Sequence, residues 1–247
     1  MTDFTTAAVA FNQVSKSFGA KQVLCDVSFE VPAGQALCIL GRSGTGKSVT
    51  LKLIISLLKP DSGTIWIEND EITRLKTPEL SRVRRKMGYL FQDAALFDSL
   101  TLYENLALPL VRLTQKSREE IDFVVDRVLR QVGLNGDENK MPSELSGGMR
   151  KRAGLAHALV LEPKILLADE PSSGLDRITA GEIDELMLEQ KAQHQTTLII
   201  VTHDVHGAKR VGDRIAVFDK GRLIAHGTAA EVGVSEHEVA RKLISEQ

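Results

Sequence analysis

The segment with the clearest chemical pattern is a glycine-rich run that ends in lysine and serine. It has the spacing G-x-x-x-x-G-K-[ST] and consists of Gly41, Arg42, Ser43, Gly44, Thr45, Gly46, Lys47 and Ser48, followed by Val49. Glycines let successive backbone N–H groups turn inward around phosphate groups. The pattern predicts that Lys47 pairs with the β- and γ-phosphates of a nucleotide and that the Ser48 hydroxyl binds Mg²⁺. The alternative is a glycine-rich turn with an exposed lysine.

Two adjacent carboxylates follow an apolar run. Asp169 and Glu170 come directly after residues 165–168. Because a buried carboxylate is costly without a compensating cation, Asp169 is predicted to hold Mg²⁺ through water. Glu170 points in another direction and is predicted to act as general base on a water aimed at the γ-phosphate. In the alternative, both carboxylates only cap the turn at Pro171.

A second anion-binding segment lies in the middle of the chain. Ser146 precedes Gly147 and Gly148, and the basic residues 150–152 follow. A serine followed by two glycines at the start of a helix makes an anion-binding N-terminus. Since the glycine-rich loop already supplies the donors for one triphosphate, this segment is predicted to contact the nucleotide of a neighbouring copy. Two chains would then form two composite sites.

The surrounding elements predict an α/β fold with a mostly parallel core sheet, an antiparallel sheet and a helical insert. Continuous apolar runs predict buried strands at residues 36–40, 87–91, 165–168 and 198–201. A helix-prone segment over about 47–57 follows the glycine-rich loop. Alternating residues predict antiparallel strands, and a hairpin is expected to turn at 219–221; these segments are 23–31, 65–67 and 214–226.

Capping signals predict two helices outside the sheets. Ser117 and Glu120 fit a capping box, and Gly133 fits the end of the helix that they begin. The last residues, 235–247, are expected to form one amphipathic helix. The middle of the chain is therefore predicted to be helical.

The composition excludes several classes of protein. The chain has 247 residues, 43% of them hydrophobic, and a net charge of −2, which argues against disorder and against attraction to nucleic acid or acidic lipid. Cys25 and Cys38 lie in apolar runs and are expected to be reduced, as in the cytosol. No secretory signal is expected. The most apolar stretch, 106–113, contains Pro109 and Arg112, so no membrane span is expected.

Together these motifs resemble the ATP-binding-cassette (ABC) ATPases over residues 11–227, in the order of that family. The resemblance implies ATP and Mg²⁺ as ligands, with Gln92 in the glutamine loop, His203 as the histidine switch and Asp176 in the D-loop. It implies that Glu170, His203 and Gln92 are catalytic, that Ser48, Gln92 and Asp169 bind the metal, and that Phe18 stacks on adenine. Two residues depart from the common pattern, since Phe18 replaces tyrosine and Met149 replaces glutamine.

The resemblance also implies the organisation of the chain and its partners. It implies a P-loop NTPase (RecA-like) fold in a single domain, with 9–92 and 161–228 as the core and antiparallel subdomain, 93–160 as the helical subdomain and 229–247 as a C-terminal tail. The expected partners are a second copy in an ATP-sandwich dimer and a transmembrane permease, with no nucleic acid. The expected place is the cytoplasmic face of the inner membrane.

The amino-acid sequences of these motifs are similar to those of the ATPases of lipid transporters that work with Mce-domain proteins, and the Mla type is the nearest. The similarity rests on residues 141–149, 91–98, 174–181 and 203–208. It implies an Mce-domain lipid-binding partner.

Rival functions stay open at this point. The chain could drive another importer or a non-transport machine such as cell division, and a small-molecule P-loop kinase is a further alternative. The apolar residues 94–97 after Gln92 are predicted to face a permease. In the alternative, Leu96 and Phe97 pack into the helical insert.

Overall fold

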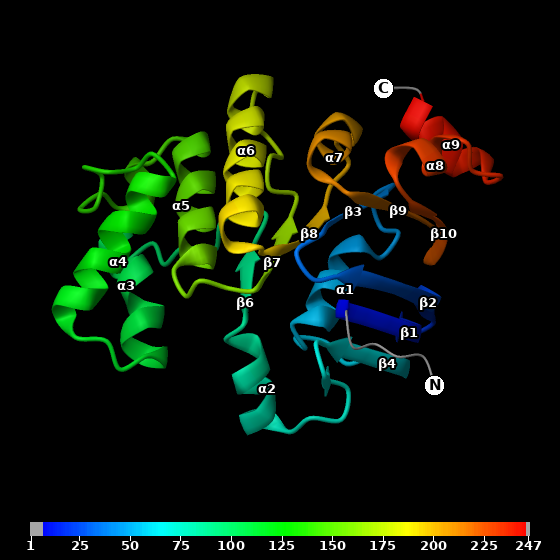
Figure 1. Ribbon diagram of the computed structural model, residues 1–247, viewed down its shortest axis with the longest axis horizontal. Helices are drawn as coiled ribbons and strands as arrows, with labels where there is room; N and C mark the ends of the chain where they lie inside the picture. Colours follow the sequence, from blue (N-terminus) through cyan, green and yellow to red (C-terminus); the bar gives the residue numbers. More distant parts are fainter. Residues whose placement is uncertain (1–6, 246–247) are drawn as a thin grey trace.

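Two β-sheets carry the fold in the computed structural model, which describes residues 7–245 (Figure 1). One sheet has the order β2-β1-β4-β5 and is antiparallel. The core sheet has the order β10-β9-β3-β8-β7-β6, parallel from β9 to β6, with β10 as an antiparallel edge. The strands are β1 (Ala7–Phe18), β2 (Lys21–Pro32), β3 (Ala36–Gly41), β4 (Ser62–Ile67), β5 (Asp70–Glu71), β6 (Met87–Leu90), β7 (Ile165–Asp169), β8 (Thr197–Val201), β9 (Arg214–Asp219) and β10 (Arg222–Gly227).

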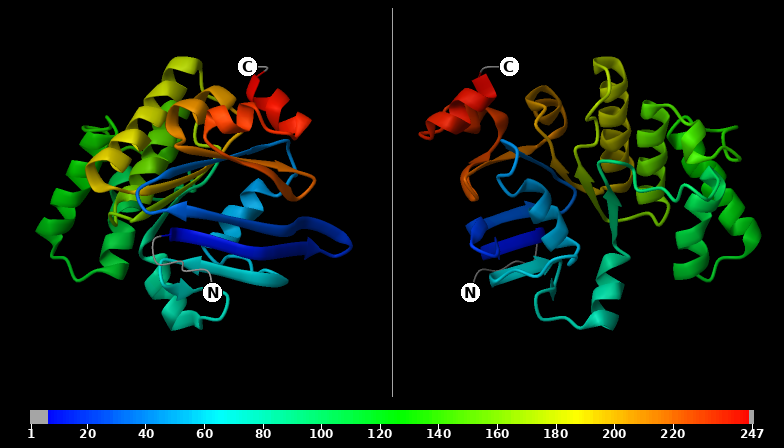
Figure 2. Two further views of the ribbon diagram at one scale, coloured as in Figure 1. Left: turned by 45° about the vertical axis from the view of Figure 1, so that its right-hand side comes forward. Right: turned by 180° about the vertical axis from the view of Figure 1, so that it is seen from behind.

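The core sheet is buried on both faces because its strands alternate between two apolar clusters. Leu37 and Ile39 of β3 face the cluster that holds the antiparallel sheet, and Cys38 and Leu40 face the opposite cluster. In Figure 2, α1 lies between the two sheets. The helices are α1 (Lys47–Ile54), α2 (Thr77–Arg84), α3 (Leu102–Leu113), α4 (Arg118–Gln131), the 3₁₀ helix η1 (Pro142–Glu144), α5 (Gly147–Leu159), α6 (Arg177–His194), α7 (Val205–Val211), α8 (Ala229–Gly233) and α9 (Glu238–Ser245).

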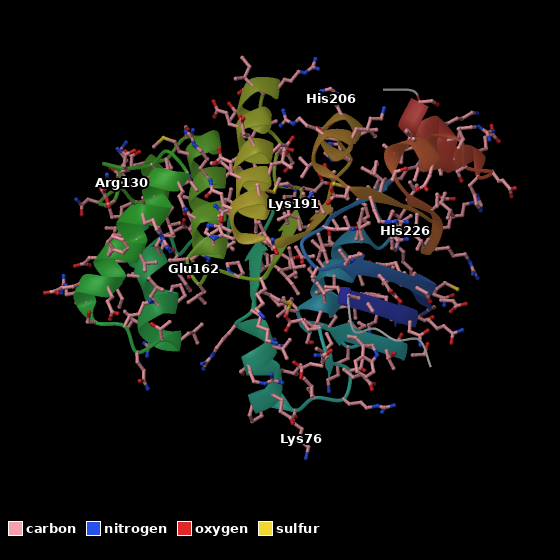
Figure 3. The ribbon with its side chains drawn as sticks, in the orientation of Figure 1. Lys76, Arg130, Glu162, Lys191, His206 and His226 are labelled. Atoms are coloured by element: carbon pink, nitrogen blue, oxygen red, sulfur yellow. The ribbon has the colours of Figure 1, made fainter. Side chains whose placement is uncertain are left out.

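A separate apolar cluster joins α3, α4 and α5, at the left of Figure 1. The predicted capping box of α4 is confirmed, since Glu120 N donates to Ser117 Oγ at 3.3 Å and Ser117 N donates to Glu120 Oε2 at 2.6 Å. Gly133 follows with a φ of +66°, as the end of this helix requires. Figure 3 labels Arg130 on α4 at this end of the molecule, away from Lys191 of α6 and His206 of α7. We call α3, α4, η1 and α5 the helical subdomain.

The predicted α/β fold is confirmed, and so is the hairpin of β9 and β10. Two predicted helices were wrong in extent. The first ends at Ile54 rather than near Leu57, because Ser56 has a φ of +56° and the next backbone N–H groups bond back to Lys52. The tail begins with a separate helix, α8, and α9 starts only at Glu238. Residues 246–247 of the predicted tail helix lie outside the described residues.

No helix within residues 7–245 combines the length and the apolar character that a membrane span needs. Cys25 and Cys38 are both free thiols, as predicted. Cys38 is fully buried in β3, and burial raises the pKa of its thiol to about 12.

Candidate active site

The glycine-rich loop joins β3 to α1 and lies at the end of the core sheet. Gly46 has a φ of +103°, and a Cβ there would lie 2.8 Å from the carbonyl oxygen of Val23, so only glycine fits this position. The buried Lys47 follows as the first residue of α1. Its Nζ donates to Gly41 O at 2.8 Å and to Arg42 O at 3.3 Å. The carbonyl groups of the loop therefore hold the ammonium group within the loop, at the place where a bound phosphate group would contact it.

A hydroxyl and a carboxylate meet beside this loop. Ser48 Oγ donates to Asp169 Oδ1 at 2.8 Å, which connects α1 to the end of β7. Burial raises the pKa of Asp169, the Ser48 hydrogen bond opposes this, and the charge of Glu170 adds to it. Both groups are oxygen ligands of the kind that Mg²⁺ prefers, and a cation would stabilise the buried carboxylate. These two residues therefore fit the Mg²⁺ ion that the sequence predicts.

A buried phenol faces the same carboxylate. Tyr89 of β6 packs against Phe91 with ring centroids 4.1 Å apart, and its buried hydroxyl lies near Asp169. Burial and the charge of Asp169 raise the pKa of Tyr89. The sequence interpretation missed this residue, since an aromatic in an apolar run looks like ordinary core.

The predicted base and the predicted histidine are in contact. His203 Nδ1 lies 2.8 Å from Glu170 Oε2. Glu170 has a φ of +51°, and its backbone N–H donates to Val201 O at 2.8 Å. Backbone strain of this kind is concentrated at functional sites, and here it separates the direction of Glu170 from that of Asp169. The His203 side chain is 72% exposed, so its ring is free to meet a nucleotide in the space beside Glu170.

A cavity of about 550 Å³ is lined by ten of the predicted site residues. The predicted residues among those that line it are Phe18, Ser43, Gly44, Gly46, Lys47, Ser48, Val49, Gln92, Glu170 and His203. Phe18 is 47% exposed, and Lys16 Nζ lies 5.5 Å from the centre of its ring. The cavity therefore offers an aromatic face at one point, a phosphate loop at another, and a base beside them.

Comparison with known proteins agrees with this geometry. The sequence profile of the family described as "ABC transporter" matches residues 24–173. The chain belongs to the ABC transporter family. It is 44% identical to the "Probable ribonucleotide transport ATP-binding protein mkl" of Mycobacterium leprae, over 96% of this chain and 69% of that protein. It is 40% identical to "Methionine import ATP-binding protein MetN 2" of Bacillus cereus, over 91% of this chain and 67% of that protein.

Solved structures of ABC cassettes have the same fold. The cassette MJ0796, in its dimeric post-hydrolysis state with ADP and Pi, matches with a TM-score of 0.83 and 33% identity, over 89% of this chain and 98% of that one. CbiO1 of Clostridium perfringens, part of the complex cbiONQ, matches with a TM-score of 0.85 and 31% identity, over 96% of this chain and 94% of that one. The chain is an ABC ATPase, which binds ATP with Mg²⁺ as the usual partner ion. ABC cassettes form dimers and work with a membrane permease.

The second anion-binding segment, Ser146, Gly147 and Gly148, begins α5, and we call it the signature loop. Ser146 Oγ accepts from Met149 N at 3.3 Å, so the predicted helix cap is confirmed. Ser146 and Gly147 are exposed, and a Cβ at Gly148 would lie 2.8 Å from Thr179 Cγ2. None of the three is among the residues that line the cavity of the glycine-rich loop. Their contact with a nucleotide stays a prediction.

Asp176 begins α6 and acts as its N-cap. Its Oδ1 accepts from Ile178 N at 2.9 Å and from Thr179 N at 3.1 Å, and its Oδ2 accepts from Thr179 Oγ1 at 2.7 Å. The Thr179 hydrogen bonds lower the pKa of Asp176. The structure thus gives Asp176 a capping role, and its predicted role toward the nucleotide stays a prediction.

Asn105 and Lys151 are two buried polar residues that sequence reasoning missed. Asn105 Nδ2 donates to the carbonyl oxygens of Phe97, Leu100 and Thr101, and its Oδ1 accepts from Phe97 N at 2.7 Å. Lys151 of α5 reaches the glutamine loop and Glu170. Burial lowers the pKa of Lys151, and the charges of Asp93, Glu170 and Asp169 oppose this. The partners of Lys151 are distant in the sequence, whereas those of Asn105 are four to eight residues away, and neither residue belongs to a pattern that signals burial.

Proposed function

We propose that two copies of this ABC ATPase hydrolyse ATP in composite sites, each built from the glycine-rich loop of one chain and the signature loop of the other. One observation carries the proposal. The cavity of about 550 Å³ brings together Lys47, Glu170 and His203 of one chain, while Ser146 and Gly147 are exposed outside it. A capped helix N-terminus with an exposed serine and glycine suits an anion that a second chain brings.

Each residue of the cavity has a chemical task in this proposal. Glu170 accepts the proton of the attacking water, and its contact with His203 fixes the direction of the carboxylate. A His203 that donates from both ring nitrogens would bind Glu170 through Nδ1 and a phosphate oxygen through Nε2. Lys47 exchanges its loop carbonyls for phosphate oxygens. The Mg²⁺ ion, held by Ser48, Asp169 and Gln92, would neutralise phosphate charge.

The dependence of ATPase activity on protein concentration tests this proposal. Composite sites require dimers, so the specific activity of the purified chain should rise steeply with concentration and then reach a plateau. A constant specific activity that needs an added acceptor molecule would contradict composite sites and support a small-molecule kinase.

We propose further that the dimer drives a membrane permease at the cytoplasmic face of the inner membrane and that the cargo is a lipid. The segment after Gln92 supports the first part, because Phe97 is 53% exposed while Leu96 packs against the helical subdomain. The four hydrogen bonds of Asn105 hold this segment with Phe97 outward. The similarity of residues 141–149 to Mce-associated ATPases supports the second part and suggests an Mce-domain partner.

Proteoliposomes test the cargo. The chain, reconstituted with the permease and Mce-domain protein encoded beside it, should move labelled phospholipid only with ATP. The names of the two relatives offer ribonucleotides and methionine as rival cargoes. Movement of one of these with no movement of lipid would overturn the lipid assignment. A chain that binds no permease would favour a non-transport machine.

A further inference from the structure

Lys151 makes three hydrogen bonds to three functional segments. Its Nζ donates to Gln92 O at 2.6 Å, to Glu170 O at 3.1 Å and to Ser173 Oγ at 3.2 Å. The residue is only 8% exposed. An ammonium group has three donors and no acceptor, so these contacts use its whole capacity. One side chain thus joins the glutamine loop, the catalytic carboxylate segment and the D-loop.

The helix around Lys151 approaches the glutamine loop very closely. Gly154, one turn further along α5, faces Ala94, and a Cβ at Gly154 would lie 2.7 Å from Ala94 Cβ and 2.9 Å from Ala94 Cα. Ala94 and Ala95 both have positive φ angles, so this segment is locally constrained. A shift of α5 would therefore displace the segment after Gln92.

The same helix presents the signature loop. Ser146 caps α5, and Lys151 lies five residues further along the chain. In Figure 1, α5 lies between α4 and α6, so it can contact both the other helices of the helical subdomain and the core. One rigid helix therefore carries a group for the neighbouring chain's nucleotide at its start and a group for its own catalytic segment about one and a half turns later.

We propose that Lys151 is a positioning residue, which holds Glu170 and Gln92 of its own chain in place for hydrolysis and ties both to the signature helix. The proposal rests on the composite sites proposed above. When Ser146 binds the nucleotide of the neighbouring chain, a movement of α5 would therefore be transmitted through Lys151 to the Glu170 backbone of the chain that carries Ser146. Each site of the dimer would then influence the other through α5.

Lys151→Met tests the positioning role, since methionine fills a similar volume without a charge or a donor. We expect kcat to fall about 10- to 100-fold, as for a misplaced catalytic group. KM and melting temperature should change little, and Lys151→Arg should restore most of the rate. The control is Lys116→Met, at an exposed lysine before α4 that lies outside every proposed site, and it should leave kcat within about twofold. Equal loss of kcat, ATP affinity and melting temperature in Lys151→Met would show a merely structural role and overturn the proposal.

Heterodimers with two affinity tags give the sharper test. The reference pairs a wild-type chain with a Glu170→Gln chain, so that one site works. Lys151→Met placed in the Glu170→Gln chain should leave the reference rate, whereas Lys151→Met in the other chain should lower it about 10- to 100-fold. The opposite pattern would mean that Lys151 acts through the signature loop alone, and it would overturn the proposal.

Failure of this inference can be told apart from failure of the proposed function. A wild-type chain without concentration-dependent ATPase would refute the composite sites themselves. A wild-type chain that shows this activity, with Lys151→Met equal to it in kcat, would refute only the role of Lys151.

Discussion

The catalytic side chains around the core sheet are held by partners in the same chain, whereas Ser146 and Phe97, which are predicted to contact other chains, are exposed. Ser48 bonds to Asp169 and His203 contacts Glu170. The Ser146 hydroxyl caps α5, and Asn105 holds the backbone of Phe97 in the segment before α3, but both residues remain exposed. The difference is what we expect if the core performs the chemistry and the exposed residues contact other chains. Substitutions in the two regions should therefore fail in different ways.

The largest effect is expected from Glu170→Gln in the core. The amide removes the base but leaves Asp169 in place, so turnover should fall about 10²–10⁴-fold while ATP binding persists. Size-exclusion chromatography should then show an accumulated ATP-bound dimer. Near-normal turnover would show that Glu170 is not the general base, and the core would then lack the catalytic role that distinguishes it from the exposed residues.

His203→Ala should give the next largest effect. Loss of a donor to the transition state costs about 3 kcal/mol in the barrier. Because the side chain is exposed, melting temperature and ATP affinity should change little. An ATPase assay beside a thermal melt checks this, and a lowered melting temperature with an unchanged rate would contradict it.

Phe97→Ala probes the outward-facing region. Truncation of an aromatic interface residue costs about 2 kcal/mol or more in binding, so affinity for the permease should fall while ATPase of the isolated chain persists. Phe123→Ala is the matched control, because Phe123 of α4 is 68% exposed and lies outside the segment that follows Gln92. Equal losses of permease binding in both variants would show that the contact is not specific to this segment.

The smallest effect is expected from Asp169→Asn without nucleotide. Burial disfavours the charged carboxylate, and asparagine keeps an oxygen for the Ser48 hydroxyl. The melting temperature should rise by a few degrees, since about 1 kcal/mol corresponds to about 2–4 °C in a chain of this size. Stabilisation by Mg²⁺ and ATP should shrink at the same time. A lowered melting temperature would show that the carboxylate stabilises the free chain.

Local signals explain what the sequence could predict. The glycine-rich loop, the Ser117 cap and the hairpin are each encoded by neighbouring residues, and all three occur where expected. The family resemblance implied that Glu170 and His203 are both catalytic, and the structure adds their contact, which arises because parallel strands β7 and β8 end side by side. Composition and periodicity alone did not predict it.

Long-range contacts, and local conformations that no residue type signals, explain what the sequence could not predict. Lys151 belongs to a basic run that looks like a solvated helix face, yet its acceptors at Gln92 and Glu170 are distant in sequence. The end of α1 was misplaced because Ser56 takes a left-handed conformation that no local residue type announces. Asn105 looks like a polar residue of an amphipathic helix but is fully buried.

Complementation between two inactive chains tests the central claim, the composite sites, most directly. Lys47→Ala removes the phosphate contact of its own chain, and Ser146→Arg blocks the signature loop offered to the partner. Each variant alone should be inactive, and Ser146→Arg should bind ATP normally as a monomer. A mixed dimer has one intact site, so a 1:1 mixture should recover about a quarter of the wild-type rate. No recovery from folded, mixed dimers would show that each chain completes its own site and would contradict the account.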